Sequence, residues 1–85
     1  MPYIEKESRN YVDPIIEELI EEEPDAGELT YIFYRLLLNY YKSHGGRYAV
    51  ASQVMGILDC TGKEFYQRKI LPYEIQQRIK NGDVS

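Results

Sequence analysis

The length and composition of the chain indicate one small folded domain. Its 85 residues fall below the typical domain size of about 100–150 residues, so we expect a single domain over residues 1–85. Hydrophobic residues make up 44% of the sequence and aromatic residues 13%, whereas disordered chains are poor in both. These values exclude a multidomain protein and a disordered chain.

The apolar runs and the cysteine content indicate where the protein resides. Unbroken apolar runs such as residues 31–34 and 36–38 are far shorter than the ~18 residues that a membrane span needs. No apolar stretch follows a basic head near the start, as it would in a secretory signal. The lone Cys60 is untypical of small secreted domains, which carry paired cysteines. We therefore expect a cytoplasmic protein with no membrane partner.

Charge is unevenly distributed along the chain, whose formal net charge is −4. Residues 1–28 contain ten acidic and two basic residues, a balance of −8. Residues 29–85 contain eight basic and four acidic residues, a balance of +4. The acidic segment is expected either to fold back on the basic part or to orient two subunits head to tail.

The first predicted helix covers residues 14–23. Asp13 is a typical N-cap, and Pro14 suits the first helical position because its missing N–H would have no intrahelical partner there. Apolar residues recur every three or four positions and glutamates fill the other face, which predicts an amphipathic helix ending near Pro24. The apolar positions are Val12, Ile15, Ile16, Leu19 and Ile20.

The second predicted helix covers residues 26–44. Asp25 and Glu28 have the spacing of a capping box, and Gly45 and Gly46 provide a helix stop because glycine adopts positive φ without steric cost. Apolar residues surround most of this helix and leave only a narrow polar seam. The seam consists of Arg35, Asn39 and Lys42.

A helix this apolar is usually buried on several sides. In so short a chain, one of those sides is expected to be covered by another subunit. Tyrosine suits such a contact, since its ring covers apolar area while its hydroxyl stays in water, and the chain contains nine tyrosines and no tryptophan. The interface candidates are Tyr31, Tyr34, Leu38 and Tyr41.

The third predicted helix covers residues 47–71, and a short fourth covers residues 73–80. Twenty-five residues span about 37 Å, more than a compact domain of this size requires, so protrusion toward a partner is expected. Pro72 is expected to end or bend the third helix. Gly56 and Gly62 are each unfavourable in a helix by ~1 kcal/mol relative to alanine, and close approach of another helix would explain both.

Together these elements predict an all-α fold with three main helices and a short C-terminal one. We expect a small helical bundle that forms a homodimer through the second and third helices. No β pattern of useful length is present.

Several segments resemble a known protein family over most of the chain. They are the opening MPYI, the acidic DPIIEELIEE, the LTYIFYRLLLNYY segment, the GILDC and EFYQRKILPYE stretches, and the terminal NGDV. The sequence resembles a small family encoded by bacteriophages, prophages and their hosts, for which no activity is established. The resemblance implies a phage-related setting and transfers no catalytic residue or cofactor.

Two kinds of enzymatic site have candidate residues in the sequence. Closely spaced glutamates between Glu17 and Glu23 resemble the Mg²⁺-binding face of all-helical nucleotide pyrophosphohydrolases, but no second acidic pair follows Glu28. His44 and Cys60 are the single residues of their types, too few for a zinc site. We expect His44 to cap a helix and Cys60 to pack as a small hydrophobic residue.

Nucleic-acid binding by residues 63–80 is the main alternative function. Cations in this segment alternate with tyrosines that could stack on bases. The same cations could instead neutralise the acidic first helix, in keeping with the negative net charge. The nucleic-acid candidates are Lys63, Arg68, Lys69 and Arg78.

The sequence thus favours a non-enzymatic helical interaction or assembly protein that acts as a homodimer and needs no cofactor. A nucleic-acid-binding accessory protein is the alternative, and a Mg²⁺-dependent phosphohydrolase is the third hypothesis.

Overall fold

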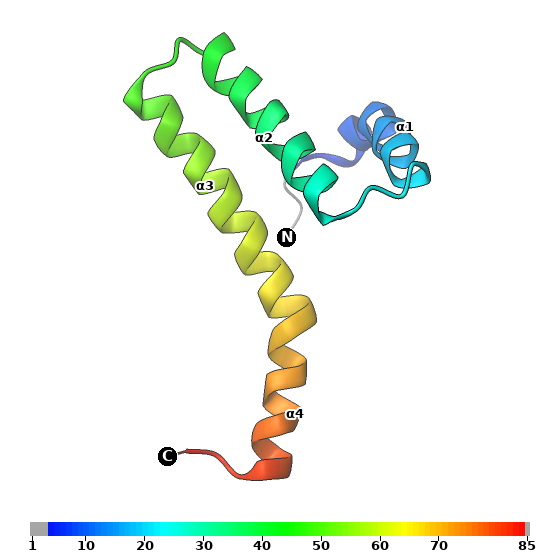
Figure 1. The fold of residues 1–85 in the computed structure, drawn as a ribbon, viewed down its shortest axis with the longest axis vertical. Coiled ribbons are helices and arrows are strands. Elements are labelled where there is room, and N and C mark those ends of the chain that lie inside the picture. Colours follow the sequence, from blue (N-terminus) through cyan, green and yellow to red (C-terminus); the bar gives the residue numbers. More distant parts are fainter. Residues whose placement is uncertain (1–3, 85) are drawn as a thin grey trace. The chain divides into compact units, whose positions relative to one another are not determined.

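A computed structural model describes residues 4–84, and Figure 1 shows a chain of helices. In order they are α1 (Lys6–Glu21), α2 (Ala26–Ser43), α3 (Tyr48–Phe65), the π-helical turn η1 (Tyr66–Ile70) and α4 (Leu71–Asn81). The described part of the chain contains no strand, so the all-α prediction is confirmed. The chain divides into two compact units, residues 1–36 and 37–85, and α2 crosses the boundary. The single domain, the bundle and the dimer stay predictions.

Helix α1 begins earlier than predicted. It starts at Lys6, after an N-cap at Glu5, and Pro14 lies inside it. The predicted N-cap at Asp13 is therefore wrong. An internal proline removes one backbone hydrogen bond, here to the carbonyl of Asn10, and its ring crowds the preceding turn. Residues on both sides keep helical geometry despite this local loss.

Helix α1 ends in a strained residue just before Pro24. Its C-cap is Glu22, and Glu23 has φ 49°, a left-handed conformation that disfavours residues with a Cβ. The N–H of Glu23 donates to the carbonyl of Ile20 at 3.0 Å. The predicted stop near Pro24 is confirmed, and the reversal occurs at a residue that is not glycine.

Helix α2 begins with the predicted capping box. The N–H of Glu28 donates to Asp25 Oδ1 at 2.8 Å, and the N–H of Asp25 donates to Glu28 Oε1 at 3.1 Å. Each side chain therefore satisfies a backbone donor that the helix itself cannot.

Helix α2 ends at the two glycines, as predicted. Gly45 has φ 102° and Gly46 has φ 62°, and the N–H of Gly46 donates to the carbonyl of Tyr41 at 2.9 Å. The Tyr41 hydroxyl donates back to the carbonyl of Gly46 at 2.7 Å. This turn leads into α3, and the Tyr40 hydroxyl donates to Gln53 Oε1 at 3.1 Å, which joins the end of α2 to α3 within residues 37–85.

Helices α3 and α4 form one uninterrupted rod through η1 (Figure 1). Pro72 lies in the first turn of α4 and does not end the helix. The preceding turn is widened, since the N–H of Leu71 donates to the carbonyl of Tyr66, five residues back. A proline clashes with the carbonyl four residues before it in a regular α-helix, and the π turn changes that register. The predicted break at Pro72 is replaced by this turn, and the rod ends at Gly82, which has φ 83°.

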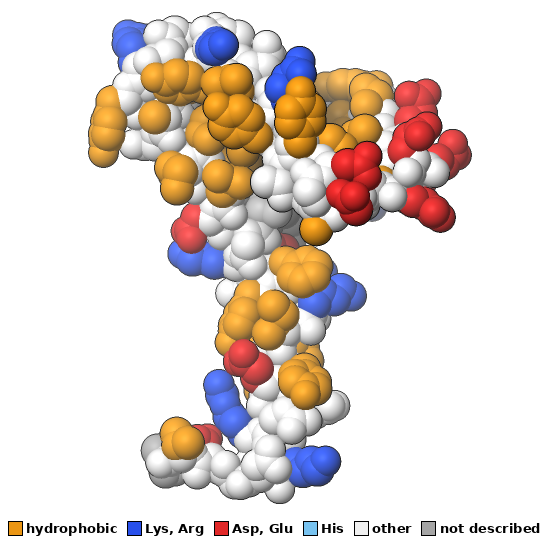
Figure 2. Space-filling model, in the orientation of Figure 1, with side chains coloured by type: hydrophobic (Ala, Val, Ile, Leu, Met, Phe, Trp, Pro, Cys, Tyr) orange, Lys and Arg blue, Asp and Glu red, His pale blue; other side chains and the backbone are white. Residues whose placement is uncertain are grey.

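Very little of the described chain is buried. Val50, 7% exposed, is the one buried residue among residues 4–84. Large apolar side chains remain accessible on every α-helix, and Figure 2 shows them as orange groups on the visible face. Because helix stability in proteins comes mostly from packing of an apolar face, these helices carry more apolar surface than the described chain covers.

We predict that Asp25→Ala lowers the free energy of unfolding by about 1 kcal/mol, because it removes the N-cap acceptor of α2. Urea unfolding followed by circular dichroism measures the change. Asp25→Ser keeps an acceptor oxygen and serves as the control, with most of the stability retained. Equal losses in both variants would contradict a capping role.

We predict that Glu23→Gly stabilises the protein by about 0.5–1 kcal/mol, because glycine adopts positive φ without the Cβ penalty. Glu22→Gly removes the same charge at a residue with φ −72° and is expected to destabilise by a similar amount. Thermal unfolding of the two variants checks the opposite signs. Destabilisation by Glu23→Gly would contradict the strain at this position.

Candidate interaction surfaces

The four interface candidates of α2 form one stripe, here called the tyrosine stripe (Tyr31, Tyr34, Leu38 and Tyr41). Their spacing of three, four and three residues places them along one side of the helix. The Tyr31 and Tyr34 side chains are 60% and 61% exposed, whereas Leu38 and Tyr41 are half-buried. The exposed part of the stripe is therefore its N-terminal half.

Hydrogen bonds distinguish the roles of the residues in the tyrosine stripe. The Tyr41 hydroxyl is engaged in the turn at Gly46, so Tyr41 has a structural role. The Tyr31 hydroxyl accepts a hydrogen bond from Arg35 Nη1 at 2.9 Å, and the guanidinium of Arg35 lies 5.7 Å from the centre of the Tyr31 ring. Arg35 thus restrains the Tyr31 ring at the surface. Tyr31 and Tyr34 are the residues best placed to meet a partner.

The rod of α3, η1 and α4 carries a second set of exposed apolar residues. Met55 is 64% exposed, Phe65 61%, Tyr73 62% and Ile79 80%. Met55 was not among the interface candidates from the sequence, which all lie on α2. The rod is apolar on more than one side.

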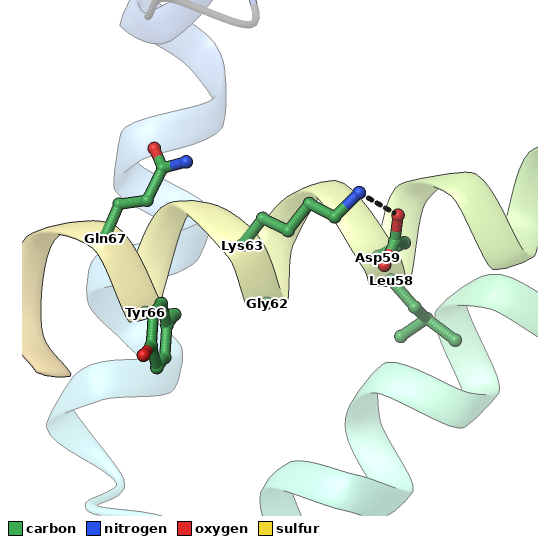
Figure 3. A pocket seen from close by; sticks show the side chains of 6 residues that line it. All are labelled: Leu58, Asp59, Gly62, Lys63, Tyr66 and Gln67. Carbon is green, nitrogen blue, oxygen red and sulfur yellow. Dashed lines mark ion pairs between the residues drawn. The ribbon is translucent and has the colours of Figure 1, made fainter. Parts of the chain in front are cut away.

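A small open hollow lies on the rod at Gly62 (Figure 3). Leu58 and Tyr66 flank the glycine at a spacing of four residues, and the missing side chain between them creates the depression. A Cβ at Gly56 or Gly62 would meet no atom within 4 Å. The predicted close approach of another helix to these glycines is therefore not found in the described structure.

The cationic candidates are distributed around the rod. Lys63 pairs with Asp59 at 2.9 Å (Figure 3), and the hydrogen bond and charge of Asp59 raise the pKa of Lys63 above its ordinary value. Arg68 pairs with Glu64. Arg68 and Lys69 are consecutive and so point about 100° apart on a helix. The structure therefore does not gather the four nucleic-acid candidates on one face.

Three cations of the rod have no ion pair within residues 4–84. They are Lys69, Arg78 and Lys80.

Tyr66 and Glu74 link η1 to α4. The Tyr66 hydroxyl donates to Glu74 Oε2, and this hydrogen bond raises the pKa of Tyr66 above its ordinary value. The contact bridges the widened turn, and sequence periodicity gave no signal for it, because the pair is eight residues apart.

The enzymatic candidates are dispersed. Within residues 4–84, no three His, Cys, Asp or Glu side chains are grouped so as to hold a metal ion. His44 Nδ1 donates to the carbonyl of Tyr40 at 2.9 Å, and its ring stacks on Tyr40 with centroids 4.1 Å apart, which agrees with the predicted capping role. Cys60 is exposed, so its predicted packing role is wrong. It lies one residue from Asp59 and three from Lys63, on the polar side of α3.

We predict that Gly62→Ala raises the free energy of unfolding by about 1 kcal/mol, because alanine favours the helix and its Cβ enters open space. Gly46→Ala is the matched control. Gly46 has positive φ, which disfavours a residue with a Cβ, so this variant is expected to lose stability. Urea unfolding measures both. A loss of stability in Gly62→Ala would show that another segment packs at Gly62.

No helix in the described residues combines the length and apolar composition that a bilayer crossing requires.

Comparisons with known proteins place the sequence in a family. Comparison with curated proteins found no match, and comparison with solved structures found none. The model of one family, described as a domain of unknown function, matches residues 1–84 and carries no link to bacteriophages. The chain belongs to this family, DUF6899.

Proposed function

We propose that the protein is a non-enzymatic helical assembly module that forms a homodimer through α2 and α3. One observation carries the proposal: Val50 is the single buried residue in the described chain, while large apolar side chains are exposed on all four α-helices. Monomeric soluble proteins rarely expose extended apolar patches, and those that do use them for contacts. The tyrosine stripe supplies the centre of the contact.

Association has to offset several costs. A standard interface buries about 1,600 Å² in total, of which roughly 57% is apolar. The contacts have to exceed the losses of translational freedom, side-chain ordering and polar desolvation, so affinity depends on a few well-packed side chains more than on area. Exposed tyrosines are frequent in such contacts because they combine large area with few rotatable bonds.

The cellular setting is part of the proposal. An exposed free thiol at Cys60 suits a reducing compartment, since disulfides form in oxidising ones, and this supports a cytoplasmic location. The resemblance of the sequence to phage-encoded proteins supports a role in phage or prophage biology.

Nucleic-acid binding by residues 63–80 is the weaker proposal. Lys63 and Arg68 are already paired with carboxylates, and the cations encircle the rod. A phosphate backbone that follows one face would therefore meet few of them at once. The negative net charge further reduces non-specific attraction.

We predict that the purified protein has twice its 10.0 kDa chain mass at micromolar concentration, and that Tyr31→Ala/Tyr34→Ala weakens self-association at least tenfold, because truncating central interface tyrosines typically costs more than about 1.4 kcal/mol. Size-exclusion chromatography with light scattering measures the mass. A strict monomer for the unchanged chain would refute the proposal.

The control is Tyr73→Ala. It removes a tyrosine that is 62% exposed and lies outside α2 and α3. This variant is expected to keep the dimer. Equal weakening in both variants would remove the tyrosine stripe from the interface.

A further inference from the structure

The two units of the chain carry opposite charge and similar apolar stripes. Residues 1–36 contain ten acidic and three basic residues, a net charge of −7, whereas residues 37–85 contain seven basic and four acidic residues, a net charge of +3. In Figure 2 red side chains gather on the unit that carries α1, and blue side chains occur along the rod.

Helix α1 presents an exposed apolar stripe with acidic flanks. Ile15, Ile16 and Ile20 are 59%, 43% and 57% exposed. Glu17 precedes Ile20 by three residues and Glu18 follows Ile15 by three, so a carboxylate lies beside the stripe on each side. The structure gives neither glutamate an ion pair within the described residues.

Helix α4 presents a stripe of the same length at the basic end of the rod. Leu71, Ile75 and Ile79 recur every four residues, which is the spacing of Val12, Ile16 and Ile20 in α1. Ile75 is 43% exposed and Ile79 80%. Arg78 follows Ile75 by three residues and so lies beside the stripe. Residues 66–81 contain four basic residues and one acidic residue, Glu74, a net charge of +3. Rows of residues four apart on two helices interdigitate in the commonest form of helix packing.

The rod is long for a chain of this size. From Tyr48 to Asn81 it has 34 residues, which corresponds to about 51 Å. A compact domain of 85 residues has a radius of gyration of about 12 Å and is roughly 30 Å across. The rod is therefore longer than a compact domain of this size is wide.

We propose that the acidic helix α1 of each copy docks on the basic α4 end of a second copy, and that the two copies exchange this contact reciprocally. The occupant of the α4 stripe is thus α1 of the partner copy. This proposal rests on the self-association proposed above and names a second contact that orients it. The apolar stripes provide the buried area, and the flanking charges fix which helices pair.

Two charge-reversed variants test the exchange. Glu17→Lys/Glu18→Lys makes the flanks of α1 basic, and Lys69→Glu/Arg78→Glu, at two cations with no ion pair within residues 4–84, makes the α4 end of the rod acidic. Each variant alone is expected to self-associate at least tenfold more weakly than the unchanged chain. In an equimolar mixture both exchanged contacts again join opposite charges, so the mixture is expected to recover the dimer. Light scattering measures mass, and circular dichroism verifies that each variant is helical.

A control and the outcomes that would overturn the exchange complete the test. Lys42→Glu/Arg47→Glu makes the same charge change outside α4, and is expected to keep the dimer. Failure of the mixture to associate overturns the exchange. The exchange is also overturned if either variant alone self-associates as tightly as the unchanged chain. The same holds if the control variant self-associates as weakly as the α4 variant. A lower free energy of unfolding in each variant, with no recovery on mixing, would assign the contact to one chain and also overturn the exchange. If the unchanged chain itself is monomeric, the proposed function fails first, which separates the two failures.

Discussion

The structure depends on one constraint: each helix has an apolar face, and the described chain buries almost none of it. A helix of 11–18 residues in water is marginal on propensity alone, and packing supplies most of its stability. Here Val50 is the one buried residue among residues 4–84. Local devices hold the helix ends, as at the Asp25 capping box and the Gly45-Gly46 turn, but they contribute about 1 kcal/mol each. Most of the stability has to come from surfaces that these helices offer to other helices.

The sequence predicted features that short-range geometry determines. Asp25 and Glu28 bond reciprocally because a capping box needs only four consecutive residues, and Gly45 and Gly46 reverse the chain because positive φ is local. Two proline predictions were less successful. Pro14 was expected to start a helix and Pro72 to end or bend one, yet α1 continues through the first, and a π turn adjusts the backbone before the second. A sequence pattern predicts that a proline destabilises a helix interior. It does not show whether the neighbouring turns can change their geometry to accommodate the ring.

Exposure was harder to predict than helix position. Cys60, expected to pack as a small hydrophobic residue, is exposed, and Gly62, expected to meet another helix, faces open space. Both predictions assumed that apolar or small residues in a helix meet a neighbouring helix. That assumption fails on this rod of 34 residues, where apolar side chains such as Met55 and Phe65 are also exposed. Tyr31 and Tyr34, by contrast, were selected because α2 is apolar around most of its circumference, and both are exposed.

Charge and apolar area have different roles in the assembly proposed for this chain. Exposed ion pairs contribute about 0–1 kcal/mol each and are screened by salt, so the flanking charges of α1 and α4 cannot hold two copies together. Apolar burial can, but it is non-directional, and a chain with apolar stripes on several helices could pair in several registers. Residues 1–36 have a net negative charge and residues 37–85 a net positive charge. Because like charges in contact repel, this distribution raises the free energy of every pairing that joins like units. The uneven charge of the sequence is therefore best understood as the determinant of orientation, with affinity supplied by the side chains between the charges.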